Sequence, residues 1–321
     1  MEQAYEATRR AFSQTLLRLA KNNRHIVAMT SDSRGSVTLN AYAEELPEQY
    51  IEMGIAEQNL VSAASGLTSF GFVPFVCSPA CFLSMRSIEQ VKVDVAYSAT
   101  NVKLIGISAG VSYGALGMSH HSLQDFAVMR AIPNLAIIAP CDAVQTEAVT
   151  EVIAAFQGPV YVRLGRNPVS QVYAPGTDCF QWGKAVELAA GNDVTIIATG
   201  EVVQAAVTAA KQLRQQGIKA RVLNMHTIKP LDNEAVLRAA RETRAIITVE
   251  EHSVMGGLGG AVAEVLGQHQ PCPLRIMAIA DEVTPSGSQS ELLAHYGLDA
   301  AGITACVTGV AREAARDRAF K

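Results

Sequence analysis

The chain has 321 residues, of which 49% are hydrophobic and 17% are charged, and its formal net charge is −4. Such a chain can bury a large core, and its length suggests two domains. It has one tryptophan and no basic block, so we expect no nucleic-acid partner. Its six scattered cysteines complete no zinc motif, and its charged N-terminus lacks an apolar signal core. We therefore expect a cytoplasmic protein with reduced thiols and no metal site of its own.

The residues from Gln58 to Met85 form an uncharged run that is long enough to cross a bilayer. Two glycines and two prolines interrupt this run. Glycine and proline favour turns and chain breaks. We therefore predict that the run folds as a helix, a turn and a strand within the core, and that the chain does not enter a membrane.

Apolar runs of strand length alternate with longer helical patterns along the first half of the chain. The expected strands are 25–29, 73–76, 102–107, 135–138 and 160–162. The expected helices are 58–69, 84–99 and 143–156. This alternation predicts an α/β fold in which a mostly parallel sheet is covered by helices on both faces.

A second domain of the same kind is expected in the second half of the chain. The segment 167–178 contains two prolines, a glycine and an asparagine and has no clear period, which is typical of a linker. Beyond it, the expected strands are 193–199, 220–223, 245–249 and 274–277, and the expected helices are 202–216, 261–266 and 300–316. We place two doubly wound domains at 1–168 and 185–321, with a linker at 169–184.

Glu57 is the only ionisable residue in the segment 54–60, and no charged residue follows it until Arg86. Apolar surroundings disfavour the charged form of a carboxyl group. An acid in such surroundings can hold a proton for a ring nitrogen of a ligand. The alternative is that Glu57 only begins a helix, where a negative charge interacts favourably with the helix dipole.

The loop 108–121 follows an expected strand and contains three glycines and two adjacent histidines, His120 and His121. Ligands of parallel sheets bind beyond the carboxyl ends of the strands, so a site is expected here. The alternative is a solvated histidine pair. The segment 110–114 also matches the GxSxG pattern of a hydrolase, but Gly114 and Gly117 break the helix that should follow the serine.

Four motifs, in this order and spacing, resemble the transketolase family. They are GIAEQ at 54–58, GxxGxSHH at 114–121, RAIPN at 130–134 and APCD at 139–142. In that family these motifs belong to the pyrimidine-binding domain, and residues 193–200 and 228–232 resemble the C-terminal domain that follows it. The GDG…N motif, with which a full transketolase binds a metal and a diphosphate, is absent. The resemblance therefore implies the C-terminal half of a split transketolase.

The resemblance implies a thiamine diphosphate site that is shared with an N-terminal, diphosphate-binding subunit, which would carry Mg²⁺ or Ca²⁺. It also implies a heterotetramer with two copies of each subunit. The expected reaction transfers a two-carbon ketol unit between sugar phosphates. Three alternatives remain: a deoxyxylulose-phosphate-synthase-like enzyme, which the segment 249–252 resembles; a 2-oxo-acid dehydrogenase beta subunit; and a catalytically silent binding subunit.

The resemblance assigns cofactor roles to three residues. Glu57 corresponds to the catalytic glutamate that hydrogen-bonds the aminopyrimidine ring. Phe82 corresponds to an aromatic residue that stacks on that ring, and Arg86 is expected to approach the cofactor. The alternatives are that Phe82 belongs to the core and that Arg86 pairs with carboxylates of the partner.

The resemblance also assigns substrate roles. His120 corresponds to a catalytic histidine that contacts the sugar and exchanges protons with its oxygens. Arg166 corresponds to an arginine that binds the substrate phosphate, a group that suits a guanidinium. Arg10 and Ser36 resemble two further phosphate contacts, and the alternative places both of them on the surface.

Three residues depart from the family pattern near this site. Leu116 stands where transketolases have an aspartate that contacts a substrate hydroxyl. Ser108 stands where many have a histidine, and Met118 replaces a proline. These departures leave the donor and acceptor sugars open.

Overall fold

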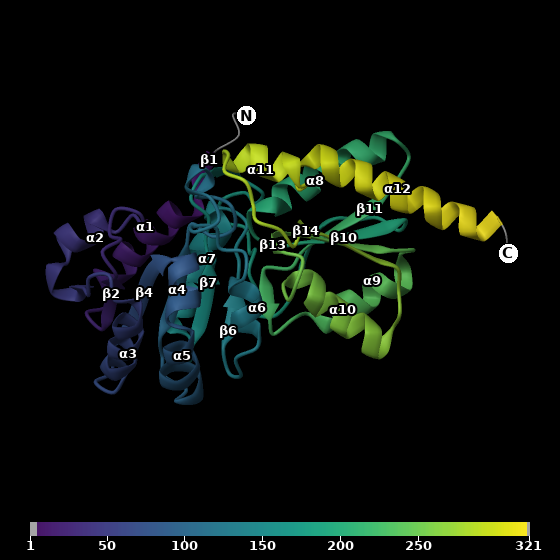
Figure 1. The fold of residues 1–321 in the computed structure, drawn as a ribbon. Helices are drawn as coiled ribbons and strands as arrows, with labels where there is room; N and C mark the ends of the chain where they lie inside the picture. Colours follow the sequence, from purple (N-terminus) through teal and green to yellow (C-terminus); the bar gives the residue numbers. More distant parts are fainter. Residues whose placement is uncertain (1–4, 320–321) are drawn as a thin grey trace.

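Two open sheets form the centre of the molecule in the computed structural model, which describes residues 5–319 (Figure 1). The strands of the first sheet are β2 (Ile26–Thr30), β3 (Tyr50–Glu52), β4 (Val73–Pro79), β5 (Lys103–Ile107), β6 (Ala136–Ile138), β7 (Val160–Arg163) and β12 (Thr227–Lys229). They lie in the order β12-β6-β7-β5-β4-β2-β3, and only β12 pairs antiparallel.

The second sheet has five strands, in the order β14-β13-β10-β11-β9. They are β9 (Val186–Ala189), β10 (Val194–Ala198), β11 (Ala220–Asn224), β13 (Ile246–Ser253) and β14 (Leu274–Ile279). All pairs are parallel except the edge pair of β9 with β11. A short antiparallel ribbon joins β1 (Tyr5–Ala7) to β8 (Pro168–Ser170). The arrangement confirms the predicted α/β fold with two mostly parallel sheets.

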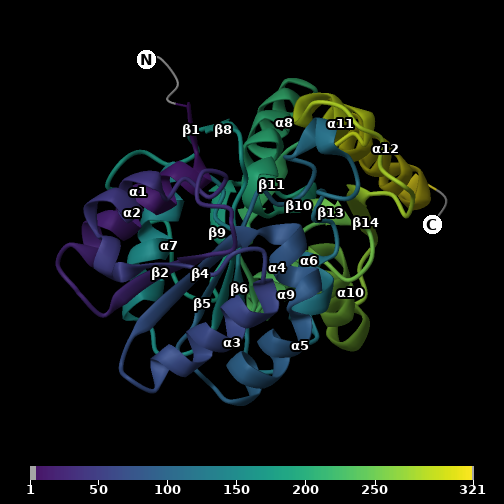
Figure 2. The ribbon, with the colours of Figure 1, turned by 60° about the vertical axis from the view of Figure 1, so that its left-hand side comes forward.

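Helices cover both faces of the first sheet (Figure 2). One face carries α1 (Thr8–Ala20), α2 (Asn40–Glu45) and α7 (Ala143–Ala155). The other face carries α3 (Glu57–Thr68), α4 (Ala80–Arg86), α5 (Ile88–Gln90) and α6 (Asp125–Arg130). Strands β2, β4 and β5 are buried at every position because both of their faces are covered. This double burial explains why their sequences are continuous apolar runs rather than alternating patterns.

The second sheet is also covered on both faces. Helices α8 (Val203–Gln215), α11 (Gln289–His295) and α12 (Ala300–Ala319) pack on one face, and α9 (Asn233–Glu242) and α10 (Leu258–His269) on the other. Helix α8 ends as the sequence predicts. Gly217 has a φ of +81° just beyond that end, a conformation that glycine adopts without strain.

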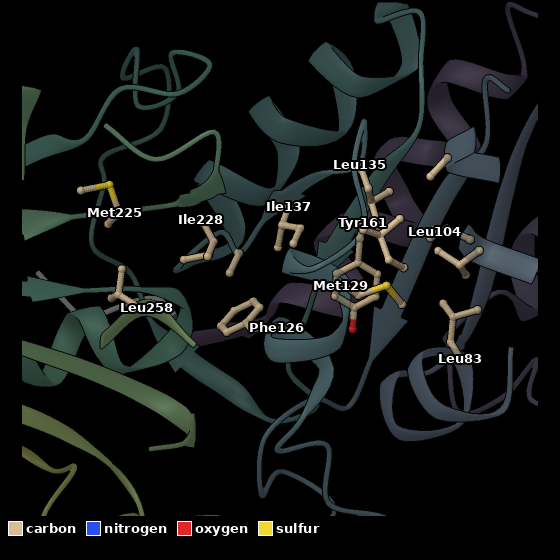
Figure 3. Close-up of a cluster of buried hydrophobic side chains, with 14 of the residues drawn as sticks. Leu83, Leu104, Phe126, Met129, Leu135, Ile137, Tyr161, Met225, Ile228 and Leu258 are labelled. Carbon is tan, nitrogen blue, oxygen red and sulfur yellow. The ribbon is translucent and has the colours of Figure 1, made fainter. Parts of the chain in front are cut away.

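A continuous apolar core joins the two sheets. Figure 3 shows Phe126 and Ile137 of the first half facing Ile228 and Leu258 of the second, all of which are buried. Strand β12 lies within the predicted second domain by sequence, yet it completes the first sheet by pairing with β6. The two halves are therefore held against each other by shared core as well as by shared sheet.

One predicted helix is wrong. The segment 84–99 is divided into the end of α4, the short α5 and a π-helical segment, Val91–Tyr97. The division falls at Ser87, whose hydroxyl donates to the Leu83 carbonyl oxygen and so competes with the helix backbone. The uncharged run 58–85 forms α3, β4 and most of α4, and within residues 5–319 no helix is long and apolar enough to span a bilayer.

Candidate active site

The carboxyl ends of five parallel strands of the first sheet, β2, β3, β4, β5 and β7, lie at one edge. Ligands of doubly wound sheets bind at such an edge. A cavity of about 320 Å³ lies there. Its walls come from the segments after β2, β3, β4 and β5, and they consist of Ser31, Asp32, Ser33, Ser36, Ile55, Glu57, Pro79, Phe82, Arg86, Tyr113, Leu116 and His120.

Glu57 begins α3 and faces this cavity with a side chain that is only 5% exposed. Its Oε1 atom lies 2.9 Å from Nη1 of Arg86. The loop before it is held by Glu52, whose Oε1 accepts hydrogen bonds from the backbone N–H groups of Asp32 (2.6 Å) and Gly54 (3.0 Å). Burial acts to raise the pKa of Glu52, but these hydrogen bonds outweigh it and lower that pKa. The charged Glu52 side chain thus fixes the loop that precedes Glu57.

Phe82 and Arg86 lie one turn apart on α4, which begins directly after β4. The Arg86 guanidinium carbon lies 3.8 Å from the centroid of the Phe82 ring, a cation–π contact. Phe82 is half-buried and lines the cavity, so it is not simply a core residue. Glu57, Phe82 and Arg86 therefore form one contiguous group.

The two histidines of the loop 108–121 have different surroundings. The His120 ring is half-buried, and its centroid lies 5.3 Å from the rings of both Phe82 and Tyr113. His121 is buried, with Nδ1 2.9 Å from Thr284 Oγ1 and Nε2 3.0 Å from the Gly114 carbonyl oxygen. Burial lowers the pKa of His121, which keeps its ring neutral. The structure thus brings His120 to the cavity and gives His121 a packing role.

Arg166 lies beside the cavity, after β7. Its Nη1 atom is 3.5 Å from Ser108 Oγ, and its guanidinium carbon is 4.9 Å from the centroid of the Tyr113 ring. Arg9 donates from Nε to the Arg166 carbonyl oxygen (2.9 Å) and from Nη1 to the Ser36 carbonyl oxygen (2.7 Å). Burial and the nearby Arg166 charge lower the pKa of Arg9. Two neighbouring guanidinium groups favour an anion between them.

Arg10 lies apart from this group. Its side chain is 69% exposed, and its Nε atom lies 3.9 Å from Oε1 of Glu6 in β1. The residue that reaches Arg166 and Ser36 is Arg9, which the sequence analysis did not single out. Helical periodicity could have distinguished the two arginines, because Arg10 lies on the same helix face as the polar, exposed Gln14 four positions later.

One of the three departures from the family pattern, Leu116, lines this cavity. Leu116 is 54% exposed, and Met118, two positions along the same loop, is 42% exposed. Ser108 is buried. Ser112, the serine of the GxSxG pattern, is buried with its hydroxyl 2.6 Å from the Ala109 carbonyl oxygen, so it is no exposed nucleophile.

Residues 5–171 match the transketolase pyrimidine-binding domain, and residues 183–303 match the transketolase C-terminal domain. The chain belongs to the transketolase family. This membership confirms the resemblance in the sequence. It also implies that the enzyme depends on thiamine diphosphate, as the family does. Transketolase-like enzymes are transferases, and this chain carries two of their domains.

Two curated relatives and one solved structure resemble nearly the whole chain. An apulose-4-phosphate transketolase subunit from Phocaeicola vulgatus is 53% identical, over 92% of this chain and 95% of the relative. A 6-deoxy-6-sulfo-D-fructose transketolase subunit from Clostridium sp. is 41% identical, over 89% and 88%. A split gene transketolase, described as an inactive beta4 tetramer, superposes with a TM-score of 0.87 at 40% identity, over 94% of this chain and 97% of that one.

Proposed function

We propose that this chain is the pyrimidine-binding subunit of a split transketolase, which transfers a two-carbon ketol unit between sugar phosphates only together with a diphosphate-binding subunit. The observation that carries the proposal is the convergence of Glu57, Phe82 and His120 on one cavity at the carboxyl edge of the first sheet. The relatives that are named as transketolase subunits support a separate partner chain.

The residues at this cavity fit the aminopyrimidine end of thiamine diphosphate. A shielded carboxylate suits a hydrogen bond to a ring nitrogen, and an aromatic side chain suits stacking on a heteroaromatic ring. Glu57 and Phe82 provide these two groups, and Arg86 borders both of them. When bound, the cofactor supplies the carbanion chemistry of ketol transfer, while the protein binds and orients it.

The other end of the cofactor requires groups from elsewhere. Among residues 5–312, whose side chains the structure describes, no group of three or more His, Cys, Asp or Glu side chains is arranged to hold a metal ion. We propose that the diphosphate and its Mg²⁺ or Ca²⁺ are held by the partner chain, and that two copies of each chain form a heterotetramer. The description of the related split transketolase structure as an inactive beta4 tetramer supports the need for a partner.

The remaining residues of the site handle the sugar phosphate in this proposal. His120 exchanges protons with the sugar oxygens, because it is the histidine that faces the cavity. Arg166 binds the phosphate, with Ser36 beside it and Arg9 supplying a second positive charge. Arg10 was predicted for the phosphate as well, and its exposed position favours Arg9 instead.

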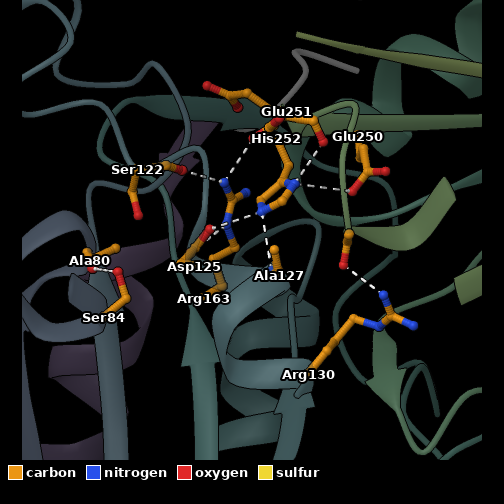
Figure 4. A network of polar contacts seen from close by, with 12 residues as sticks. Ala80, Ser84, Ser122, Asp125, Ala127, Arg130, Arg163, Glu250, Glu251 and His252 are labelled. Carbon is orange, nitrogen blue, oxygen red and sulfur yellow. Dashed lines mark hydrogen bonds and ion pairs between the residues drawn. The ribbon is translucent and has the colours of Figure 1, made fainter. Parts of the chain in front are cut away.

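The alternatives receive less support. The segment 249–252, which resembles deoxyxylulose-phosphate synthases, is buried within strand β13 of the second sheet and does not line the cavity (Figure 4). Its side chains therefore do not contact a substrate bound in the cavity. A silent binding subunit would have no chemical need for a shielded Glu57 beside Phe82 and His120.

Exchange of Glu57 for glutamine tests the proposal in a complex reconstituted with a diphosphate-binding subunit. We expect Glu57→Gln to lower turnover by about 100-fold or more while assembly is retained. Glu44→Gln, at an exposed carboxylate of α2, is the matched control and should leave turnover unchanged. Turnover of Glu57→Gln that equals the control would contradict the proposal.

A further inference from the structure

The substrate residues lie on two irregular segments that need external support. His120, Tyr113 and Leu116 belong to the loop 108–121, in which the only helical turn is Gly114–Leu116. Arg166 belongs to the segment 164–167, between β7 and β8. Segments without regular structure keep their shape only through the contacts that they make. Contacts from the second half of the chain reach both segments.

Glu251, near the end of β13, holds the loop 108–121. Its Oε1 atom accepts a hydrogen bond from the Val111 N–H at 2.8 Å, and the side chain is buried. A Cβ atom at Gly110, where φ is +63°, would lie 2.4 Å from the Glu251 carboxyl carbon. The loop backbone therefore lies directly against this carboxyl group, at a distance that only a glycine allows.

Gln289, the first residue of α11, connects the two segments. Its Nε2 atom donates to both Glu251 carboxyl oxygens, at 3.1 and 3.2 Å. Its Oε1 atom accepts a hydrogen bond from Asn167 Nδ2 at 2.8 Å. Asn167 follows Arg166 directly and also donates to the Ser112 carbonyl oxygen at 3.4 Å. One amide side chain thus joins the loop that carries His120 to the segment that carries Arg166.

Glu201, in the turn after β10, supports the segment 164–167 from the other side. Its Oε1 atom accepts a hydrogen bond from the Thr8 hydroxyl at 3.0 Å, and that hydroxyl accepts one from the Gly165 N–H at 3.0 Å. A Cβ atom at Gly165 would lie 2.0 Å from the Glu201 carboxyl oxygens. Thr8 precedes Arg9 and Gly165 precedes Arg166, so these contacts hold the chain next to both arginines of the site.

The positions of Glu201 and Glu251 relative to the strands of the second sheet are informative. In the order β14-β13-β10-β11-β9, the connections reverse direction between β10 and β13. Doubly wound folds bind ligands in the crevice beyond the strands at such a reversal. Here Glu201 follows β10 and Glu251 lies near the end of β13, and both contact backbone of the first half instead of a ligand.

We infer that the C-terminal domain positions the substrate site, with Glu201, Glu251 and Gln289 as positioning residues for the loop 108–121 and the segment 164–167. The inference rests on the proposed function for the identity of the site. It gives the second domain a defined task in that function. In a free-standing doubly wound domain, the crevice at this strand reversal would bind a ligand. Here its side chains hold the two segments of the first domain that carry the substrate residues.

Hydrogen exchange of the full chain tests the inference without cofactor or partner. We expect Gln289→Ala to raise the exchange rates of amides in 108–121 and 164–167 by about tenfold, with no change in β10 and β13. Gln212→Ala is the matched control, since Gln212 of α8 accepts a hydrogen bond from Thr304 of α12 and so joins two helices of the second half. Unchanged exchange in the two segments, or a rise spread evenly over both sheets, would overturn the inference.

A conservative pair of variants separates positioning from general stability. Glu251→Gln keeps an oxygen acceptor for the Val111 N–H, so this amide should stay protected, whereas Glu251→Ala should lose the protection. In the reconstituted complex, Gln289→Ala should raise KM for the sugar phosphate by roughly tenfold and change kcat less. An equal loss of Val111 protection in both Glu251 variants would overturn the inference. If the loop amides exchange as expected but the reconstituted complex transfers no ketol unit, the inference is supported and the proposed function is contradicted.

Discussion

Arg163 Nε lies 2.8 Å from Asp125 Oδ2 at the junction of the two sheets, and both side chains are buried (Figure 4). The Tyr161 hydroxyl donates to the same oxygen at 2.8 Å, and Arg163 Nη2 donates to the Glu251 carbonyl oxygen at 2.7 Å. The guanidinium group therefore joins β7, α6 and β13. A charge buried in this way is tolerated because it is paired and hydrogen-bonded.

Removal of Arg163 should strongly destabilise the chain. Arg163→Met leaves the Asp125 carboxylate buried without its cation, and we expect it to lower the free energy of unfolding by about 3–5 kcal/mol. Arg18→Met is the control, since Arg18 pairs with Glu147 and Glu151 on the surface, where such pairs contribute about 0–1 kcal/mol. Urea unfolding measures both. Equal effects of the two variants would contradict the assigned role of the buried pair.

Glu201 should make stability depend on pH near neutrality. Burial, aided by the Glu251 charge, raises the pKa of Glu201 to about 7 from its ordinary value of 4.5. The folded state then binds a proton more tightly than the unfolded state does. The stabilisation is therefore complete below about pH 4.5 and is lost as pH rises through about 7.

Glu201→Gln should remove this dependence. We expect the variant to be more stable than wild type at about pH 8, by about 1–3 kcal/mol, and to lose that advantage at about pH 5. Urea unfolding at both pH values gives the difference. Glu234→Gln, at an exposed carboxylate, is the control and should leave the pH profile unchanged. Parallel profiles for wild type and Glu201→Gln would refute the expected titration.

The residues proposed to bind the substrate phosphate can be distinguished by substitution in the reconstituted complex. We expect Arg166→Ala and Arg9→Ala each to raise KM for a sugar phosphate by about 10- to 100-fold, because each removes a charge-assisted hydrogen bond. The same variants should barely affect an acceptor without a phosphate. Arg10→Ala should leave KM within about twofold of wild type. A large effect of Arg10→Ala with none from Arg9→Ala would restore the assignment made from the sequence.

Leu116 should control recognition of a substrate hydroxyl. A leucine in the cavity wall offers no hydrogen bond, so substrates with and without that hydroxyl are discriminated weakly. We expect Leu116→Asp to increase the ratio of kcat/KM for a hydroxylated acceptor over its deoxy analogue by about tenfold or more. Leu116→Ala, which adds no acceptor, is the control. An unchanged ratio in Leu116→Asp would show that this side chain does not contact the substrate.

The sequence predicts those features that depend on local pattern. The strands β2 and β5 are found because their buried residues are consecutive, and the helix at α3 because Glu57 begins an uncharged segment. The grouping of Glu57, Phe82 and His120 is expected only from the resemblance of their motifs to the transketolase family, since the sequence pattern predicts no strand at β3, directly before Glu57.

Other features depend on contacts between distant residues, and the sequence pattern does not contain them. The three residues of β12 are too few for a period, and their pairing with β6 is visible only in the fold. Likewise, the contacts of Gln289 with Glu251 and Asn167 span 38 and 122 positions of the chain. The choice between Arg9 and Arg10 required the orientation of α1, which periodicity could have supplied.

The central claim is that the cofactor site is divided between two chains. Calorimetric titration of thiamine diphosphate and magnesium into this chain, alone and mixed with a diphosphate-binding subunit, tests it most directly. We predict heat of binding in the mixture and none with this chain alone, and we expect Glu57→Gln to weaken binding in the mixture. Tight binding to the isolated chain would contradict the claim, because it would require a diphosphate and metal site within these residues.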